Sequence, residues 1–215
     1  MEGHAWEAVE TRIRACCDAG DLRGGVTVAL QEYGPWLLGY LNALVKDEDG
    51  AFEAFCEFSE DLWKGVSGFR WGSAFRTWAY RLAYHAAMRH LRARHRRRGR
   101  QVPLSRVEAL SRLQVQVRSS TRIEQRTGVK DAFTKLRESL SPEEQSLLTL
   151  RLDRNMAWDE IARVMQEEEG PVDAESLRRR ASAVRQQFCR LKGRLAETIQ
   201  TADSDLSHSP ARPSK

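Results

Sequence analysis

The sequence predicts an all-α protein with two helical domains joined by a flexible linker. Apolar residues recur every three or four positions along both halves of the chain, and no strand-like alternation of useful length appears. Between the halves, residues 99–128 are polar, have only weak periodicity and contain Pro103. We therefore expect helical domains over residues 1–98 and 129–200, a linker over 99–128, and a disordered Ser/Pro-rich tail over 201–215.

The N-terminal half has the periodicity of a helical domain. We expect its helices at about Ala5–Cys17, Val26–Val45 and Ala51–Lys64, and from Ser73 into an arginine run at residues 89–100. A glycine-rich break at residues 20–25 separates the first two, and the second either kinks or restarts at Pro35. The last helix has apolar residues on two sides, so we expect it at the centre of the domain.

The C-terminal half begins with a strong helix-start signal. Ser141 has the features of an N-cap, with Pro142 at the first helical position and Glu144 completing a capping box. Asn155 suits the left-handed residue that ends this helix. We then expect a short helix at about residues 157–165 and, after a Gly-Pro break, a long helix from about Asp173 to Ile199. Apolar residues of the long helix alternate spacings of four and three, which makes one straight seam: Leu177, Ala181, Val184, Phe188, Leu191 and Leu195.

Charge is distributed unevenly along the chain. The net charge is +5, which allows a polyanionic partner without requiring one. No acidic residue occurs between Asp61 and Glu108, and this interval contains the arginine run. By contrast, the segment from Asp47 to Asp61 is crowded with carboxylates. We therefore expect a surface that attracts anions beside one that repels them, which is typical of a protein with two partners.

The short helix and the long basic helix have the layout of a helix-turn-helix. In the major groove, arginine pairs with guanine and glutamine with adenine, while further arginines neutralise phosphates. From the pattern alone, a solvated surface helix explains the charges equally well. The candidate duplex-reading residues are Arg178, Arg179, Ser182, Arg185, Gln186, Gln187 and Arg190.

Several classes of protein are disfavoured. The four cysteines are scattered without a CxxC pair, which suits neither a disulfide framework nor a zinc site. No GxSxG, P-loop or HExxH pattern occurs, and His90 and His95 lie off a shared helical face. No signal peptide or apolar stretch of roughly 20 residues appears. We expect a cytoplasmic binding protein that does not associate with a membrane, with no catalytic residues, metal or cofactor.

Two segments of the N-terminal half resemble a known family. Residues 33–41, YGPWLLGYL, resemble the Y-x-P-x-L-x-x-Y/F-L helix of region 2 in sigma-70 family factors. Residues 63–83 are similar to that family's promoter-melting pattern, W-[RK]-x-L-x-x-F-R-G-x-[SA]-x-F-[RK]-T-W-L-Y-R-I-A. Residues 140–145 and 158–162 likewise resemble region 4. The resemblance implies a sigma factor that binds core RNA polymerase at its clamp and flap and directs transcription initiation at promoter DNA.

The extent of the resemblance indicates a subgroup. It covers about residues 26–98 and 129–198, in the family order, without the extra domains of housekeeping factors. This arrangement resembles the extracytoplasmic-function subgroup, whose usual regulator is an anti-sigma protein.

For the promoter-melting stretch, the resemblance implies that residues 68–75 capture a flipped base of the −10 element. Exposed rings offer replacement stacking worth about 1–3 kcal/mol per base. Helical spacing favours core positions for Phe75 and Trp78, whereas core and stacking roles both remain open for Phe69, Trp71 and Tyr80. The candidate residues, the −10 set below, are Lys64, Phe69, Arg70, Trp71, Ser73, Arg76, Tyr80, Arg81 and Arg89.

The chain departs from the family in the polymerase-docking helix. The family pattern is D-A-E-D-x-x-Q-E, whereas residues 50–57 read GAFEAFCE, which keeps acidic character only at Glu53 and Glu57. The candidate polymerase-binding residues, the polymerase set below, are Glu53, Glu57, Glu60 and Asp61.

A second departure concerns the helix-turn-helix. The turn at residues 166–174 is longer than usual, and Ala157 replaces a capping Ser/Thr, a loss of about 1 kcal/mol. The resemblance implies that the candidate duplex-reading residues named above bind the −35 element, and they are called the −35 set below. The base-facing residues are centred on Arg178–Ser182 or on Arg185–Arg190. We favour the second, because residues 184–192 resemble the family form LRxRFxRLKxRL. The alternative function is a helix-turn-helix regulator of duplex DNA, which needs neither the aromatic loop nor the acidic helix.

Overall fold

The computed structural model describes residues 2–97, 139–166 and 173–207. Within these ranges every regular element is helical, which confirms the predicted all-α class. The elements of the N-terminal half are α1 (Glu2–Asp18), α2 (Leu22–Val45), α3 (Glu48–Gly65), the 3₁₀ turn η1 (Val66–Gly68) and α4 (Phe75–Arg97). Those of the C-terminal half are α7 (Pro142–Leu148), the π-helical turn η2 (Thr149–Asp153), α8 (Trp158–Val164) and α9 (Ala174–Ser207). The predicted linker, residues 99–128, lies outside the described residues.

Two helices begin earlier than predicted because aspartates cap them. Asp21 accepts a hydrogen bond from the Gly24 backbone N–H at 2.8 Å, so α2 starts at Leu22 and the predicted glycine-rich break is reduced to its first residues. Asp47 likewise accepts from the Gly50 N–H at 3.0 Å and starts α3 at Glu48. Helix α2 also runs through Pro35 as one helix, without a restart.

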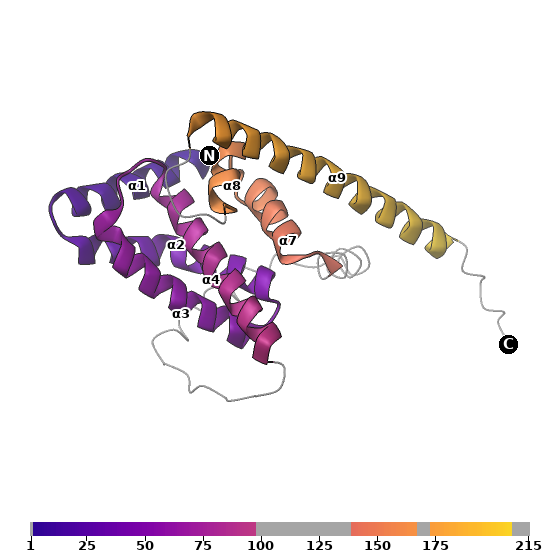
Figure 1. The fold of residues 1–215 in the computed structure, drawn as a ribbon, viewed down its shortest axis with the longest axis horizontal. Helices are drawn as coiled ribbons and strands as arrows, with labels where there is room; N and C mark the ends of the chain where they lie inside the picture. The colour runs from indigo at the N-terminus through magenta and orange to yellow at the C-terminus, as the bar shows by residue number, and fades with distance from the viewer. Residues whose placement is uncertain (1, 98–138, 167–172, 208–215) are drawn as a thin grey trace.

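Helices α2, α3 and α4 pack side by side around an apolar core (Figure 1). The largest buried side chains of this core include Tyr40, Phe55, Phe58 and Phe75. Helix α4 is buried along most of its length, between α3 and α2 on one side and α8 on the other. It is therefore the central helix that its two apolar stripes predicted.

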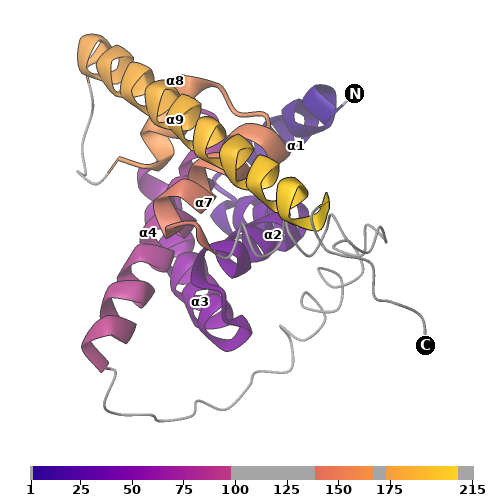
Figure 2. The same ribbon diagram turned by 90° about the vertical axis from the view of Figure 1, so that its right-hand side faces the viewer.

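The C-terminal helices follow the predicted start and stop signals. Ser141 and Glu144 form a reciprocal capping box, with hydrogen bonds of 3.1 and 3.2 Å. Helix α7 continues into the π-helical turn η2. Asn155 follows this turn, and its φ of 48° confirms the predicted left-handed residue. Helix α9 lies across α7 and α8 and projects beyond them (Figures 1 and 2).

Part of the predicted disordered tail is helical, because α9 continues to Ser207. The error has a simple cause: the helix-breaking residues of the tail, Pro210 and Pro213, both lie beyond that point. Residues 208–215 lie outside the described residues.

The two halves of the chain are in direct contact. Helix α8 packs on α4, and α7 packs on α2. The Tyr40 hydroxyl in α2 and the Ser146 hydroxyl in α7 form a buried hydrogen bond of 2.6 Å. Lys46 donates to the Leu140 carbonyl at 2.8 Å. The C-terminal helices therefore cover part of the N-terminal helical bundle.

Candidate nucleic-acid interface

The loop between η1 and α4, residues 69–74, is lined by an aromatic cluster. Phe69 stacks on Trp78 with ring centroids 4.7 Å apart and meets Trp71 edge-on at 5.1 Å. Phe75 is fully buried, as the spacing predicted, whereas Trp78, for which a core position was also predicted, is half-buried like Phe69 and Trp71. The loop therefore holds two half-buried rings that pack against each other and against the rings of Phe75 and Trp78.

Trp71 has a left-handed backbone with a φ of 56°. This conformation is unfavourable for a bulky side chain, and the family pattern quoted above has glycine at this place. Contacts of the Trp71 ring compensate for this backbone strain. Besides meeting Phe69, the ring lies with its centroid 6.0 Å from that of Phe75, and the Arg14 guanidinium lies 5.3 Å from the Trp71 ring centroid. Arg14 belongs to α1, which sequence reasoning did not connect with the loop.

Glu10, also in α1, is a second residue that sequence reasoning missed. Its carboxylate accepts hydrogen bonds of 2.7 Å from the backbone N–H groups of Phe75 and Arg76 at the start of α4. It therefore serves as the cap of a helix that begins far along the chain. The available signal was positional: Glu10 and Arg14 are one turn apart, so they share a face of α1.

The basic members of the −10 set differ in their surroundings. Arg70 is exposed on the loop. Lys64 pairs with Glu60 at 3.0 Å, and Arg89 pairs with Glu57 at 3.5 Å and also with Asp61. Ser73 and Arg81 are partly buried.

Members of the polymerase set on α3 therefore form ion pairs with basic residues of α3 and α4. Its remaining member, Glu53, lies 3.6 Å from His90, and nearby Arg94 lies 4.0 Å from Asp47. The predicted anion-attracting and anion-repelling surfaces thus meet along α3 and α4 and pair with each other. Such exposed ion pairs contribute at most about 1 kcal/mol each, so a partner can replace them.

The C-terminal helices cover two members of the −10 set. Tyr80 is 1% exposed, meets Tyr40 edge-on at 5.2 Å and lies close to Arg154 at the end of η2. Burial raises the pKa of Tyr80 to about 12, although the charges of Arg154 and Arg76 act in the opposite direction. Arg76 lies 3.7 Å from Glu160 of α8, the residue that also accepts from the buried Thr77 hydroxyl at 2.9 Å.

The −35 set lies on α9, and all of its members are exposed. Helical spacing places Arg179, Ser182 and Gln186 opposite the buried seam of α9. Gln187 and Arg190 instead line a groove of about 420 Å³ between α9 and α7. The outward face therefore combines residues from both predicted centres of the reading surface.

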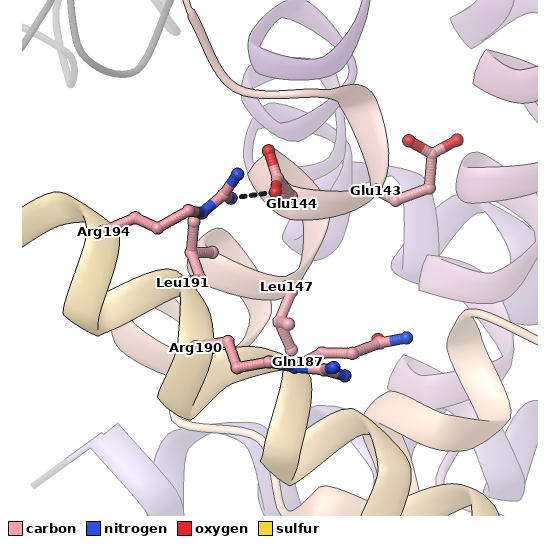
Figure 3. A pocket seen from close by; sticks show the side chains of 7 residues that line it. All are labelled: Glu143, Glu144, Leu147, Gln187, Arg190, Leu191 and Arg194. Atoms are coloured by element: carbon pink, nitrogen blue, oxygen red, sulfur yellow. Dashed lines mark hydrogen bonds and ion pairs between the residues drawn. The ribbon is translucent and has the colours of Figure 1, made fainter.

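Figure 3 shows this groove, with Arg194 and Glu144 paired near one end and Gln187 near the other. Leu147 of α7 and Leu191 of α9 supply its apolar lining. In the described parts of the chain, no group of three or more histidine, cysteine or acidic residues could hold a metal ion. No described helix is long and apolar enough to span a bilayer.

Comparison with known proteins agrees with this arrangement. The profile of the family described as Sigma-70 region 2 matches residues 29–97, from α2 to the end of α4. The chain is also similar to the RNA polymerase sigma-H factor of Pseudomonas aeruginosa. The two are 31% identical over 172 residues, which cover 75% of this chain and 84% of that protein. The chain therefore belongs to the sigma-70 family of RNA polymerase sigma factors.

Proposed function

We propose that this sigma factor binds core RNA polymerase in the cytoplasm and directs it to promoters by melting a −10 element and reading a −35 element. It acts as a regulatory subunit, with no active site of its own, and belongs to the extracytoplasmic-function subgroup. The observation that carries the proposal is the half-exposed aromatic loop at residues 69–74, which lies beside exposed Arg70 and at the head of a basic helix.

The melting step uses the rings of the loop. An unpaired base that leaves the duplex loses stacking, and the half-exposed rings of Phe69 and Trp71 replace part of it. Arg70 is free of acidic neighbours in sequence and faces solvent, so it is placed to neutralise a strand phosphate. Tyr80 and Arg76 join this surface only after the C-terminal helices move away from α4.

The reading step uses the outward face of α9. Gln186 matches an adenine edge and Arg179 a guanine edge in the major groove, with the neighbouring arginines on phosphates. This face is exposed in the present arrangement, so it needs no rearrangement to meet duplex DNA.

Polymerase contacts use two further surfaces. We propose that the carboxylates of the polymerase set dock on the clamp, where they exchange Arg89 and His90 for basic residues of the partner. The groove between α7 and α9, with Leu147 and Leu191 in its lining, is the proposed seat for an apolar segment of the flap. An anti-sigma protein that covers these surfaces would block initiation.

The experiment that tests the proposal is transcription in vitro with purified core polymerase and a pool of promoter fragments. We expect specific initiation from a subset of fragments and tighter binding to forked than to duplex −10 templates. A Glu53→Lys, Glu57→Lys double variant should weaken core binding by about tenfold. If the chain bound duplex DNA but neither core polymerase nor forked templates, it would act as a plain duplex-binding regulator.

A further inference from the structure

We infer that α1 is a positioning element for promoter melting, in which Glu10 fixes the end of the aromatic loop and Arg14 fixes Trp71. The inference rests on the proposed function of the loop and extends it to a helix outside the segment that matches the family profile, residues 29–97. Glu10 and Arg14 are positioning residues, because they act on DNA only through the loop.

Both carboxylate oxygens of Glu10 accept hydrogen bonds from the first turn of α4. One carboxylate oxygen accepts from the Phe75 N–H and the other from the Arg76 N–H, both at 2.7 Å. The buried Tyr33 hydroxyl donates to Glu10 at 3.2 Å. The first N–H groups of a helix have no partner within the helix and carry a partial positive charge, so a carboxylate there is stabilised.

Tyr33 in turn fixes the carboxylate from the core side. It is 1% exposed, and burial together with the Glu10 charge raises its pKa, so the phenol remains a hydrogen-bond donor. The ring of Trp6 packs against Tyr33 at 5.4 Å, and Arg76 lies over the ring of Trp6 at 5.6 Å. These contacts fix α1 against both α2 and the first turn of α4.

Arg14 acts one turn further along α1, at the middle of the loop. Its guanidinium lies 5.3 Å from the centre of the Trp71 ring, whose backbone is in the left-handed region. A cation over the ring favours the orientation in which Trp71 meets Phe69 edge-on. The loop is thus fixed at two points by a single rigid helix.

A simple electrostatic role for Glu10 is less consistent with this geometry. A carboxylate that only repelled DNA phosphates would not need three donors. Because the Phe75 and Arg76 N–H groups are already bonded to Glu10, a strand phosphate cannot use them without displacing it. The cap therefore sets the loop conformation before DNA arrives, which lowers the entropy that base capture must supply.

The test uses the full chain with core polymerase and follows promoter opening by the fluorescence of 2-aminopurine in the non-template −10 strand. Glu10→Gln loses one of the two backbone acceptors, and we expect opening to slow by about tenfold, which corresponds to about 1.4 kcal/mol. Glu7→Gln is the matched control, because it removes the same charge from an exposed position of α1 and should leave the rate unchanged.

Two further measurements separate positioning from a loss of fold. Glu10→Gln should bind the −35 duplex as the wild type does and should unfold only about 2–4 °C lower, because a lost helix cap costs about 1 kcal/mol. Glu10→Asp, which keeps both oxygens, should recover part of the rate. If Glu10→Gln failed to fold, Arg14→Gln would serve instead, with a two- to fivefold slower rate expected for a lost cation–π contact of about 0.5–1 kcal/mol. Arg12→Gln is its control, because Arg12 is on the same helix as Arg14 but pairs with Glu32 of α2.

The outcomes are distinguishable from failure of the proposed function. If the wild-type chain gave no opening with core polymerase, the proposed function itself would be wrong. If the wild type opened promoters and Glu10→Gln matched Glu7→Gln, or opened them faster, the positioning role would be rejected while the sigma function stood.

Discussion

The two regions proposed to contact DNA differ in how far the rest of the molecule encloses them. The loop at residues 69–74 contacts α1 through Trp71 and Arg14, and Tyr80, further along α4, is 1% exposed between Tyr40 and Arg154. Along α9, by contrast, every member of the −35 set is exposed. The proposed duplex-reading surface is thus exposed in this arrangement, whereas the proposed melting surface would include Tyr80 and Arg76 only if the two halves separated.

The largest expected effect is at Trp71, and it tests whether the enclosed region works through its rings. Trp71→Ala should slow promoter opening by up to about a hundredfold, because stacking on a flipped base contributes about 1–3 kcal/mol. Closed-complex affinity should be nearly unchanged. Trp71→Gly removes the ring without left-handed strain and should behave alike. An equal loss of opening rate and closed-complex affinity would instead assign Trp71 to folding.

On the exposed side, adjacent glutamines of α9 provide a matched pair. Gln186→Ala should change base preference at one −35 position by roughly tenfold, since a good bidentate contact is worth about 1–3 kcal/mol. Gln187→Ala, in the groove against α7, should leave base preference unchanged. Binding to a library of −35 duplexes checks both variants. A uniform loss over all sequences in Gln186→Ala would show a phosphate contact.

The smallest expected effect concerns the contact between the halves. Tyr40→Phe removes the buried hydrogen bond to Ser146, which contributes about 1 kcal/mol, and should raise the population of separated halves about fivefold. Amide hydrogen exchange in α4 beneath α8 should rise accordingly. Ser59→Ala removes the hydroxyl that donates to the Phe55 carbonyl within α3, and it serves as the control. No difference between the two variants would mean that this hydrogen bond does not limit separation.

Much of the local structure was predictable because short-range chemistry fixes it. The Ser141 capping box, left-handed Asn155 and the apolar seam of α9 each depend on residues within a few positions of one another. The aspartate caps at Asp21 and Asp47 are equally local. The glycines near them are typical of breaks and loops, and they therefore hide these caps in the sequence.

What could not be predicted depends on contacts between distant parts of the chain. Glu10 accepts a hydrogen bond from Phe75 at the start of α4, and the two residues are 65 positions apart in the sequence. Tyr80 is buried between Tyr40 of α2 and Arg154, which follows η2, and no periodicity in α4 encodes that second contact. For this reason the choice between core and stacking roles for Tyr80 remained open from the sequence, and its role in DNA binding stays a prediction.

Glu160 has one further consequence for how the halves part. One of its oxygens accepts the Ala157 N–H at 2.9 Å and caps its own helix, while the other accepts the Thr77 hydroxyl of α4. Water can replace Thr77 when α8 departs, and the intrahelical bond survives unchanged. Separation of α8 from α4 therefore need not unfold α8, and the helix can leave α4 and bind it again without refolding.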